Sequence, residues 1–489
     1  MRIILQLLTC YFLLHTMACA QPITFDHQKL VSSYNSYKEK KITHRRFQHR
    51  DIEPILQGLK RPFSVQERGK SIEGRAIYSV SIGDGDKTVL LWSQMHGDES
   101  TATMALFDIF NFLAADDGFN RVRDKLLEEL KIVFIPMLNP DGAERFQRRN
   151  ALGIDLNRDA LRLECPESRI LKDMRDELEA DWGFNLHDQS RYYAAGNNPN
   201  TAAISFLAPA YNYEKEVNPT RENSMRMIGE MNAVLQQYIP GKVGRYNDAF
   251  EPRAFGDNIQ KWGTSTILIE TGGLKGDLEK QELRKLNFIS ILTALYGIAE
   301  DRVGDYPVEA YDKIPFNNSN AFHDLVLREV QVENNGNWYT VDVGIRRREL
   351  GGATPTPYFF DAYIQDLGDL STFFAYESIS ARGKRLVPGK IYPKLISDWK
   401  ALKSLNIGDL WQEGYTTVRM EDVPAREILA RIPLKVVSAD ETRADRILPG
   451  QHPALILQEK NVNRLMIING MVYDLSKSNR ERLEWWKGL

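Results

Sequence analysis

The chain of 489 residues has very little cysteine, with only Cys10, Cys19 and Cys165. Two of the three lie within the first twenty residues, so the rest of the chain has one thiol and no partner for an intrachain disulfide. A protein of this size can be stable without disulfides if its hydrophobic core is large. No catalytic motif surrounds Cys165, and we expect a small buried apolar residue there rather than a nucleophile.

The chain also lacks an excess of charge of either sign. It has 63 Lys and Arg against 66 Asp and Glu, which gives a formal net charge of −3. This balance argues against a general nucleic-acid binder, and no charge run is long enough to predict a disordered tail. Hydrophobic residues make up 43% and charged residues 26%, as in ordinary globular proteins, and the length predicts two to four domains.

The N-terminus has the layout of a secretory signal peptide. One Arg is followed by an apolar run and by the small-residue triplet 18–20, which favours cleavage after Ala20. Three polar residues interrupt the run, which is short for a membrane span of about 20 apolar residues. Lipid attachment at Cys19 is less favoured because Thr16 fits poorly three places before it. We therefore expect a secreted or periplasmic protein with no membrane span after cleavage.

Beyond residue 60, apolar strands alternate with amphipathic helices. A hairpin is expected over 63–83, followed by buried strands at 87–95, 131–138, 181–187 and 264–270 and helices at 100–115, 166–181, 221–239 and 278–300. This alternation predicts an α/β fold whose mixed, mainly parallel sheet has helices on both faces.

Changes in composition and in expected secondary structure divide the chain into four parts. They are a signal peptide at 1–20, a helical lead-in at 21–60, the α/β domain at 61–301 and a β-rich accessory region at 302–489. In the last part, Asn-Asn-Gly-Asn (334–337) predicts the turn of a hairpin. His323 and His452 are isolated there, so no metal site is expected in this region.

Polar residues follow each of the expected buried strands. His96 and Glu99 follow the first strand, the turn 139–142 follows the second, His187 ends the third and Glu270 ends the fourth. Ligands of such sheets bind beyond the carboxyl ends of the strands. We therefore expect these residues to meet in one crevice.

His96, Glu99 and His187 have the residue types of a catalytic zinc site. Zinc accepts imidazole nitrogen and carboxylate oxygen, and a catalytic ion has three protein ligands and an open fourth position. The alternative interpretation is that both histidines are hydrogen-bonded polar residues at strand ends. We predict a single zinc ion.

Five segments together indicate a known family. They are MHGDES (95–100), NPDGAERFQRRN (139–150), GIDLNRD (153–159), NLH (185–187) and ILIETGG (267–273). With these segments in this order, residues 60–300 resemble the carboxypeptidase A-like zinc metallocarboxypeptidases. After His187 the chain continues Asp-Gln-Ser instead of the Ser-Tyr of the digestive enzymes. The resemblance is therefore to a non-pancreatic, bacterial-type branch.

The resemblance implies a role for each matching residue. His96, Glu99 and His187 would hold zinc, and Glu270 would be the general base that takes a proton from the zinc-bound water. Arg148 would polarise the scissile carbonyl and stabilise its oxyanion. The neighbouring Arg149 is a rival for this role, but Arg148 has the spacing of compact family members.

Other residues would bind the substrate. Asn157 and Arg158 match the pair that grips the C-terminal carboxylate, for which the planar guanidinium fork is suited. Tyr246 is the candidate for the tyrosine that closes over the substrate, and Tyr192 and Tyr193 are alternatives for substrate contact.

Specificity for the C-terminal residue is expected to come from side chains around 245–257. Arg245 and Arg253 in this segment raise the hypothesis of an acidic C-terminal residue. The alternative is that both arginines face solvent.

These residues predict a secreted zinc carboxypeptidase acting on peptides with a free carboxylate. Two other hydrolases would use the same zinc site, a cell-wall peptide amidase and a small-molecule deacylase. An inactive peptide-binding protein with this fold is a further alternative. No nucleic-acid partner is expected, and the accessory region would serve stability or substrate access.

Overall fold

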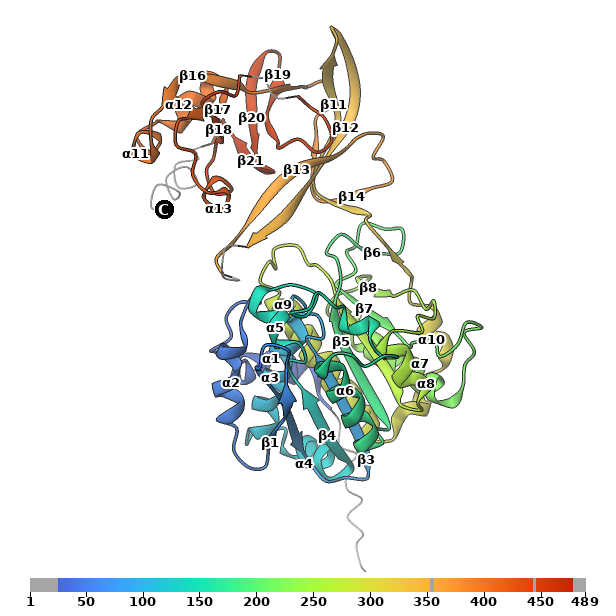
Figure 1. Ribbon diagram of the computed structural model, residues 1–489. Helices are drawn as coiled ribbons and strands as arrows, with labels where there is room; N and C mark the ends of the chain where they lie inside the picture. Colours follow the sequence, from blue (N-terminus) through green and yellow to red (C-terminus); the bar gives the residue numbers. More distant parts are fainter. Residues whose placement is uncertain (1–24, 352–355, 443–445, 478–489) are drawn as a thin grey trace, which may run out of the picture.

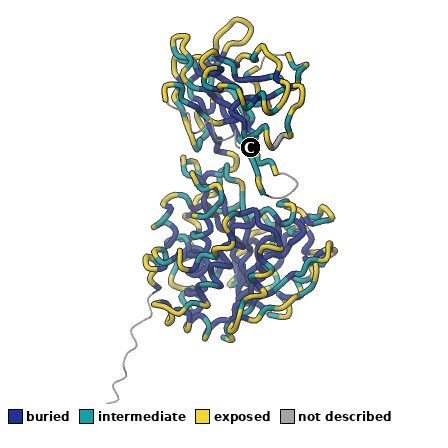
Figure 2. The backbone as a smooth tube through the Cα atoms, turned by 90° about the vertical axis from the view of Figure 1, so that its left-hand side faces the viewer, coloured by how far each residue is buried: buried dark blue, intermediate teal, exposed yellow. Residues whose placement is uncertain are grey.

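The computed structural model describes residues 25–351, 356–442 and 446–477 (Figure 1). The expected signal peptide at 1–20, with Cys19, lies outside these residues. Within the described ranges, no helix combines the length and apolar character needed to cross a membrane. Figure 2 shows two parts of the molecule, each with a buried interior.

The first part is built on an eight-stranded sheet. The strands lie in the order β1 (Ser64–Lys70), β2 (Ala76–Ile82), β4 (Leu130–Ile135), β3 (Lys87–Ser93), β5 (Trp182–Asp188), β9 (Ser265–Thr271), β7 (Ile204–Leu207) and β8 (Val243–Arg245). The four central strands run parallel, and the strands next to them, β2 and β7, pair with them antiparallel, so the predicted mixed α/β sheet is confirmed. The expected hairpin is β1–β2, with Gly74 at φ +83° in its turn. Strands β7 and β8 were not expected from the sequence because each is too short to show a pattern.

Helices cover both faces of this sheet. They are α1 (His27–Tyr37), α2 (His49–Gln57), α3 (Thr101–Ala114), α4 (Asn120–Glu129), α5 (Pro140–Arg145), the 3₁₀ turn η1 (Leu156–Arg158), α6 (Pro166–Leu178), α7 (Pro219–Leu235), α8 (Phe255–Lys261), α9 (Gln281–Ala299), the 3₁₀ turn η2 (Arg302–Asp305) and α10 (Val308–Asp312). The larger core cluster joins one sheet face to α1, α3, α7 and α9. A second cluster joins the other face to η1, α6 and α8 and contains the fully buried Cys165, as predicted.

The lead-in helices belong to the packing of the first part. The Tyr34 hydroxyl of α1 donates to Asp108 in α3 at 2.8 Å, and Arg284 of α9 donates to the same carboxylate at 2.7 Å. All three side chains are buried. At the other end, Tyr311 and Ile314 are still buried in the larger core, so the first part extends past residue 301.

One local expectation, the turn at 139–142, differs from the structure, and the start of α3 has no side-chain cap. The segment 139–142 is not a simple turn: Asn139 caps α5 by accepting from the Gly142 amide at 2.9 Å, with Pro140 at the first helical position. Ser100 precedes α3 but makes no side-chain cap, because its hydroxyl donates to the Arg45 carbonyl oxygen instead. Tertiary contacts therefore override the local capping pattern at Ser100.

The second part is β-rich, as expected, but it also contains a small parallel sheet. The larger sheet has the order β13 (Tyr358–Gly368), β12 (Asn337–Gly351), β11 (Phe322–Asn334), β15 (Arg385–Pro388), β19 (Ala454–Glu459), β20 (Val462–Ile468) and β21 (Met471–Asp474), with β14 (Phe374–Ser380) also paired to β11. The smaller sheet is β16 (Lys390–Ile396), β17 (Tyr415–Met420) and β18 (Lys435–Ser438), with α11 (Trp399–Lys403), α12 (Ile407–Gln412) and α13 (Arg426–Leu429). The pairing of Asn334 with Asn337 confirms the predicted hairpin turn.

The second part contacts the first beyond the carboxyl edge of the eight-stranded sheet (Figure 1). On one side, β10 (Asn317–Asn318) pairs with β6 (Ala194–Ala195), in the segment that follows β5. On the other side, Glu349 at the end of β12 forms ion pairs with Arg45 and Arg46. The β-rich part is therefore anchored on both sides of the edge where the polar residues were expected to gather.

Candidate active site

The predicted ligands lie at the topological switch point of the sheet, where the strand order changes direction. Strand β3 is followed in sequence by β4 on one side and has β5 on its other side. The loops leaving β3 and β5 therefore diverge and open a crevice at their carboxyl ends. His96 and Glu99 lie in the loop after β3, and His187 lies at the end of β5.

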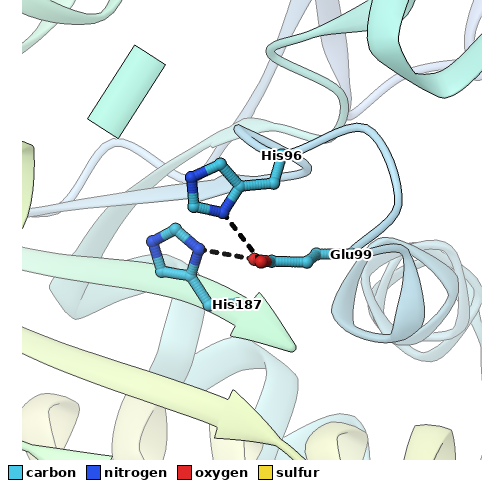
Figure 3. A group of neighbouring side chains, drawn as sticks. All are labelled: His96, Glu99 and His187. Carbon is cyan, nitrogen blue, oxygen red and sulfur yellow. Dashed lines mark hydrogen bonds and ion pairs between the residues drawn. The ribbon is translucent and has the colours of Figure 1, made fainter. Parts of the chain in front are cut away.

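His96, Glu99 and His187 come together in this crevice. Figure 3 shows both imidazole rings directed at the Glu99 carboxylate. Nδ1 of His96 is 2.8 Å from Glu99 Oε1, and Nδ1 of His187 is 2.7 Å from Glu99 Oε2. One ligand atom from each residue lies within 4.8 Å of the others, and no other such group of three occurs among the residues described.

The donor set fits a zinc ion. Two buried imidazole nitrogens and one carboxylate converge, which are the ligand types of three-ligand catalytic zinc sites. Nε2 of His96 is held by Asp155 Oδ1 at 3.1 Å, which leaves Nδ1 to face the centre of the group. A carboxylate on the far nitrogen is the usual way to orient a metal-binding histidine.

The electrostatics of the group also favour a cation. Burial works to lower the pKa of His96, but the charge of Glu99 and the hydrogen bonds to Asp155 and Glu99 outweigh it and raise this pKa to about 9. Burial likewise works to raise the pKa of Glu99, yet the two histidines hold it below its usual range. The group thus contains carboxylates kept charged in a buried setting, which a cation would stabilise.

Glu270 lies beside the triad because of the strand register. The parallel pairing of β5 with β9 places Glu270 opposite His187, so the two side chains emerge next to each other. Burial raises the pKa of Glu270 well above its usual value, and the negative charge of Glu99 raises it further. A buried carboxyl with a raised pKa beside a metal site has the character of a general base.

The structure distinguishes between the two neighbouring arginines. Arg148 Nη1 lies 3.1 Å from Glu99 Oε1 and 3.1 Å from His96 Nδ1, while its Nε donates to Asp155 at 3.1 Å. Arg149 is exposed and donates to the Gly153 carbonyl at 2.9 Å. Arg148 is therefore the guanidinium at the crevice.

Asp155 was not singled out from the sequence, although it lies in the segment GIDLNRD. Its carboxylate contacts His96 and Arg148 and accepts from the Asn157 amide at 3.0 Å. It therefore orients a candidate metal ligand, a cationic side chain and the turn that carries Asn157. Its position two residues before Asn157 was the only available signal, because an aspartate at the start of a turn is common.

The substitution Asp155→Asn is expected to weaken zinc binding by about 10- to 100-fold, the usual cost of removing the carboxylate partner of a metal-binding histidine. The measurement is a competition titration of the metal-free variant with a chelator of known affinity. Asp159→Asn is the matched control, because the Asp159 carboxylate accepts from the Glu164 and Cys165 amides, away from His96. Equal zinc affinity in the Asp155→Asn and parent proteins would contradict the orienting role.

Asn157 and Arg158 lie on the η1 side of the crevice. The Asn157 side chain accepts from the Phe255 amide at 2.9 Å, which ties it to the start of α8. The Arg158 side chain is about one third exposed, and its Nε lies 3.4 Å from a Glu251 carboxylate oxygen. An incoming carboxylate can replace this partly exposed contact.

The three candidate tyrosines separate into two groups. The Tyr246 and Tyr193 rings lie with centroids 6.4 Å apart, and the nearby Glu270 charge is one cause of a raised Tyr246 pKa, after burial. Tyr192 points away, because its hydroxyl donates to Asp324 in the β-rich part at 2.7 Å. Tyr246 and Tyr193 are therefore beside the crevice and Tyr192 is not.

The arginines considered for specificity are both paired. Arg245 donates to Asp312 at 2.7 Å, and its guanidinium lies over the Phe316 ring at 4.1 Å from the centroid. Both contacts hold the guanidinium within the protein. Arg253 forms an ion pair with Glu251 at 3.0 Å and is more than half exposed. Of the two, only Arg253 contacts Glu251, which also contacts Arg158. The hypothesis of an acidic C-terminal residue therefore depends on Arg253.

Comparison with protein families identifies the region that carries most of this site. Residues 56–218 match the zinc carboxypeptidase family Peptidase_M14. The match contains His96, Glu99, His187, Arg148 and the Asn157–Arg158 pair, and it ends before Tyr246 and Glu270. The resemblance found in the sequence is confirmed for this region.

Individual proteins show the same likeness over part of the chain. Carboxypeptidase 2 of Trichophyton rubrum is 31% identical over 129 residues, which cover 24% of this chain and 23% of that protein. Carboxypeptidase D of Rattus norvegicus is 28% identical over 131 residues, covering 23% of this chain and 10% of the relative. The chain thus spans a quarter or less of the length of these relatives. A metallo-carboxypeptidase structure from Burkholderia cenocepacia is 18% identical with a TM-score of 0.42, covering 52% of this chain and 68% of that one.

Proposed function

We propose that this chain, which carries a zinc carboxypeptidase region, is a secreted or periplasmic enzyme that removes C-terminal residues from peptides. One observation carries the proposal: the crevice brings His96, Glu99 and His187 together with Glu270 and Arg148 at one sheet edge. We further propose that the catalytic domain is centred on residues 61–301, which carry all the candidate site residues, and that the β-rich part within 302–489 is an accessory region.

Zinc held by His96, Glu99 and His187 would supply a Lewis acid that activates water and polarises the scissile carbonyl. Glu270 accepts the proton of the attacking water and returns it to the leaving amine. Burial and Glu99 raise its pKa, which makes it a stronger base than an exposed carboxylate. Arg148 donates to the developing oxyanion of the substrate carbonyl.

Asn157 and Arg158 would make the enzyme an exopeptidase. The Arg158 fork receives the C-terminal carboxylate in place of the Glu251 contact, and Asn157, fixed to α8, donates beside it. Tyr246 and Tyr193 would then close over the bound terminal residue. A substrate without a free carboxylate forfeits the charge-assisted bonds to Arg158.

Two other reactions use the same groups. A cell-wall peptide amidase or a small-molecule deacylase would also present a carboxylate to Arg158 and an amide to the metal. A catalytically inactive peptide-binding protein would need the zinc ligands but not Glu270. The buried position of Glu270 opposite His187 favours an enzyme over a binding protein.

Removal of zinc tests this function. The purified protein is expected to release C-terminal residues from a peptide mixture, to lose nearly all of this activity with a chelator, and to regain it when zinc is added back. The measurement is mass spectrometry of the peptides at several times. Cleavage at internal bonds, or release that persists after the metal has been removed, would contradict the proposal.

A further inference from the structure

A cavity of about 250 Å³ lies between the two parts of the molecule, next to the proposed active site. Its walls include Gly272 and Gly273, which directly follow β9, and Arg191, four residues after His187. At about 3.3 Å per residue, Gly272 lies within roughly 7 Å of Glu270 along the chain. The wall also includes Arg45 and residues of the segment 274–280 from the first part, and Arg347 and Tyr376 from the β-rich part.

The cavity and the proposed carboxylate site lie on opposite sides of the metal ligands. Asn157 and Arg158 are carried by η1, which packs in the core cluster of α6 and α8. Lys280, which lines the cavity, is the N-cap residue of α9 and lies on the side of the larger cluster. A peptide gripped by Arg158 with its scissile bond at the metal therefore extends its preceding residues toward the cavity.

The β-rich part is firmly joined to the cavity wall. Arg191 forms an ion pair with Asp324 of β11, and the Tyr376 hydroxyl of β14 donates to the Arg191 carbonyl oxygen at 2.5 Å. Gly273 permits this close contact, since a Cβ there would collide with the Tyr376 hydroxyl. The wall supplied by the β-rich part is thus fixed against the segment that follows Glu270.

The charges of the cavity leave one half-buried cation, Arg347, without a carboxylate partner. Five basic and four acidic residues line the wall. Arg45, Arg191 and Lys280 each have a carboxylate partner. Arg347 has none within ion-pair distance among the residues described. Its Nη2 donates to the Gly470 carbonyl at 2.6 Å, and its Nε is buried without a partner.

Arg347 is destabilised as a lone cation. Burial lowers its pKa, and the positive charge of Arg191 lowers it further, while the negative charge of Glu377 offsets only part of this effect. A partly buried guanidinium without a carboxylate partner loses hydration, and an anion from outside would offset this cost. The volume is below the range of about 300–1,000 Å³ of larger ligand pockets, so it suits a single acidic side chain.

We propose that this interdomain cavity binds an acidic group in the part of the substrate that precedes the scissile bond, with Arg347 as the residue that selects it. The inference rests on the proposed function. It gives the β-rich region a role in choosing the substrate, because Arg347 comes from β12 and reaches a cavity beside the catalytic edge.

The test uses the zinc-loaded full chain and two pairs of peptides. The pairs are acetyl-Glu-Ala-Leu with acetyl-Gln-Ala-Leu, and acetyl-Ala-Glu-Leu with acetyl-Ala-Gln-Leu, so the acid stands at two distances from the scissile bond. In at least one pair, kcat/KM is expected to be tenfold or more higher for the Glu peptide, mainly through KM. In Arg347→Gln this ratio falls toward one, and Arg347→Lys restores part of it.

Arg348→Gln is the matched control. Arg348 follows Arg347 in β12 but is exposed and donates to Asp361 at 2.7 Å, so this variant is expected to keep the parent ratio. Equal rates for Glu and Gln peptides in both pairs would overturn the inference and leave the proposed function intact.

If none of these peptides is cleaved and the zinc-loaded protein also releases no terminal residue from the peptide mixture, the proposed function is wrong, and calorimetric binding of the same peptides still decides the inference. Glu peptides that bind tenfold tighter than Gln peptides to the parent protein, but not to Arg347→Gln, support the acidic site. Equal binding of the two peptides contradicts it.

Discussion

Glutamine in place of Glu270 is expected to lower kcat by about 10²- to 10⁴-fold, while the protein still binds one zinc ion. Glutamine has nearly the shape of glutamate, so the packing at the end of β9 is kept, but its amide cannot accept the proton of the attacking water. The loss follows because the buried site offers no other carboxylate in the same position: Glu99 is engaged by both histidines. The measurement is steady-state kinetics together with metal analysis of the same preparation.

Two results would contradict this role of Glu270. Full activity of the Glu270→Gln variant would mean that another group accepts the proton of the attacking water. Loss of zinc from the variant would mean that Glu270 acts through the metal site instead. A KM within a few-fold of the parent value is expected, because Glu270 is assigned to the chemical step rather than to substrate binding.

Replacement of Arg158 by glutamine is expected to lower kcat/KM for peptides with a free C-terminus by about 10²- to 10³-fold. The physical reason is the loss of charge-assisted, paired hydrogen bonds to a carboxylate that is removed from water on binding, an effect of about 2–5 kcal/mol. The parent protein should discriminate by a similar factor against the same peptides with an amidated C-terminus. The variant should lose most of this discrimination.

The comparison needs a control that removes a neighbouring positive charge. Arg149 serves, since it is exposed and donates only to the Gly153 carbonyl among the contacts described. The Arg149→Gln variant is expected to keep the parent kcat/KM and the parent preference for a free carboxylate. If Arg149→Gln and Arg158→Gln lose the same activity, the loss reflects the general positive charge of the region rather than direct hydrogen bonds from Arg158 to the substrate carboxylate.

The central strands and the crevice could be predicted from the sequence for identifiable reasons. β3 and β4 contain continuous apolar runs and β5 and β9 are largely apolar, because a parallel strand covered on both faces buries most of its side chains. The polar residues that end these runs lie at the carboxyl edge by the geometry of parallel sheets. The short strands β7 and β8 could not be predicted, since three or four residues do not establish a periodicity.

The sequence by itself determined the strand pattern, the zinc-type ligand set and the family resemblance, because each depends on residue type and local spacing. Only the tertiary structure decided between Arg148 and Arg149, placed Tyr193 but not Tyr192 at the crevice, and brought Asp155 to His96. It alone placed the β-rich part over the catalytic edge. The reason is that these contacts join groups far apart in the chain: 49 residues separate Arg148 from Glu99, and 155 separate the Tyr192 hydroxyl from the Arg347 carbonyl that accepts from it. Such pairs are fixed by packing, on which sequence spacing gives no information.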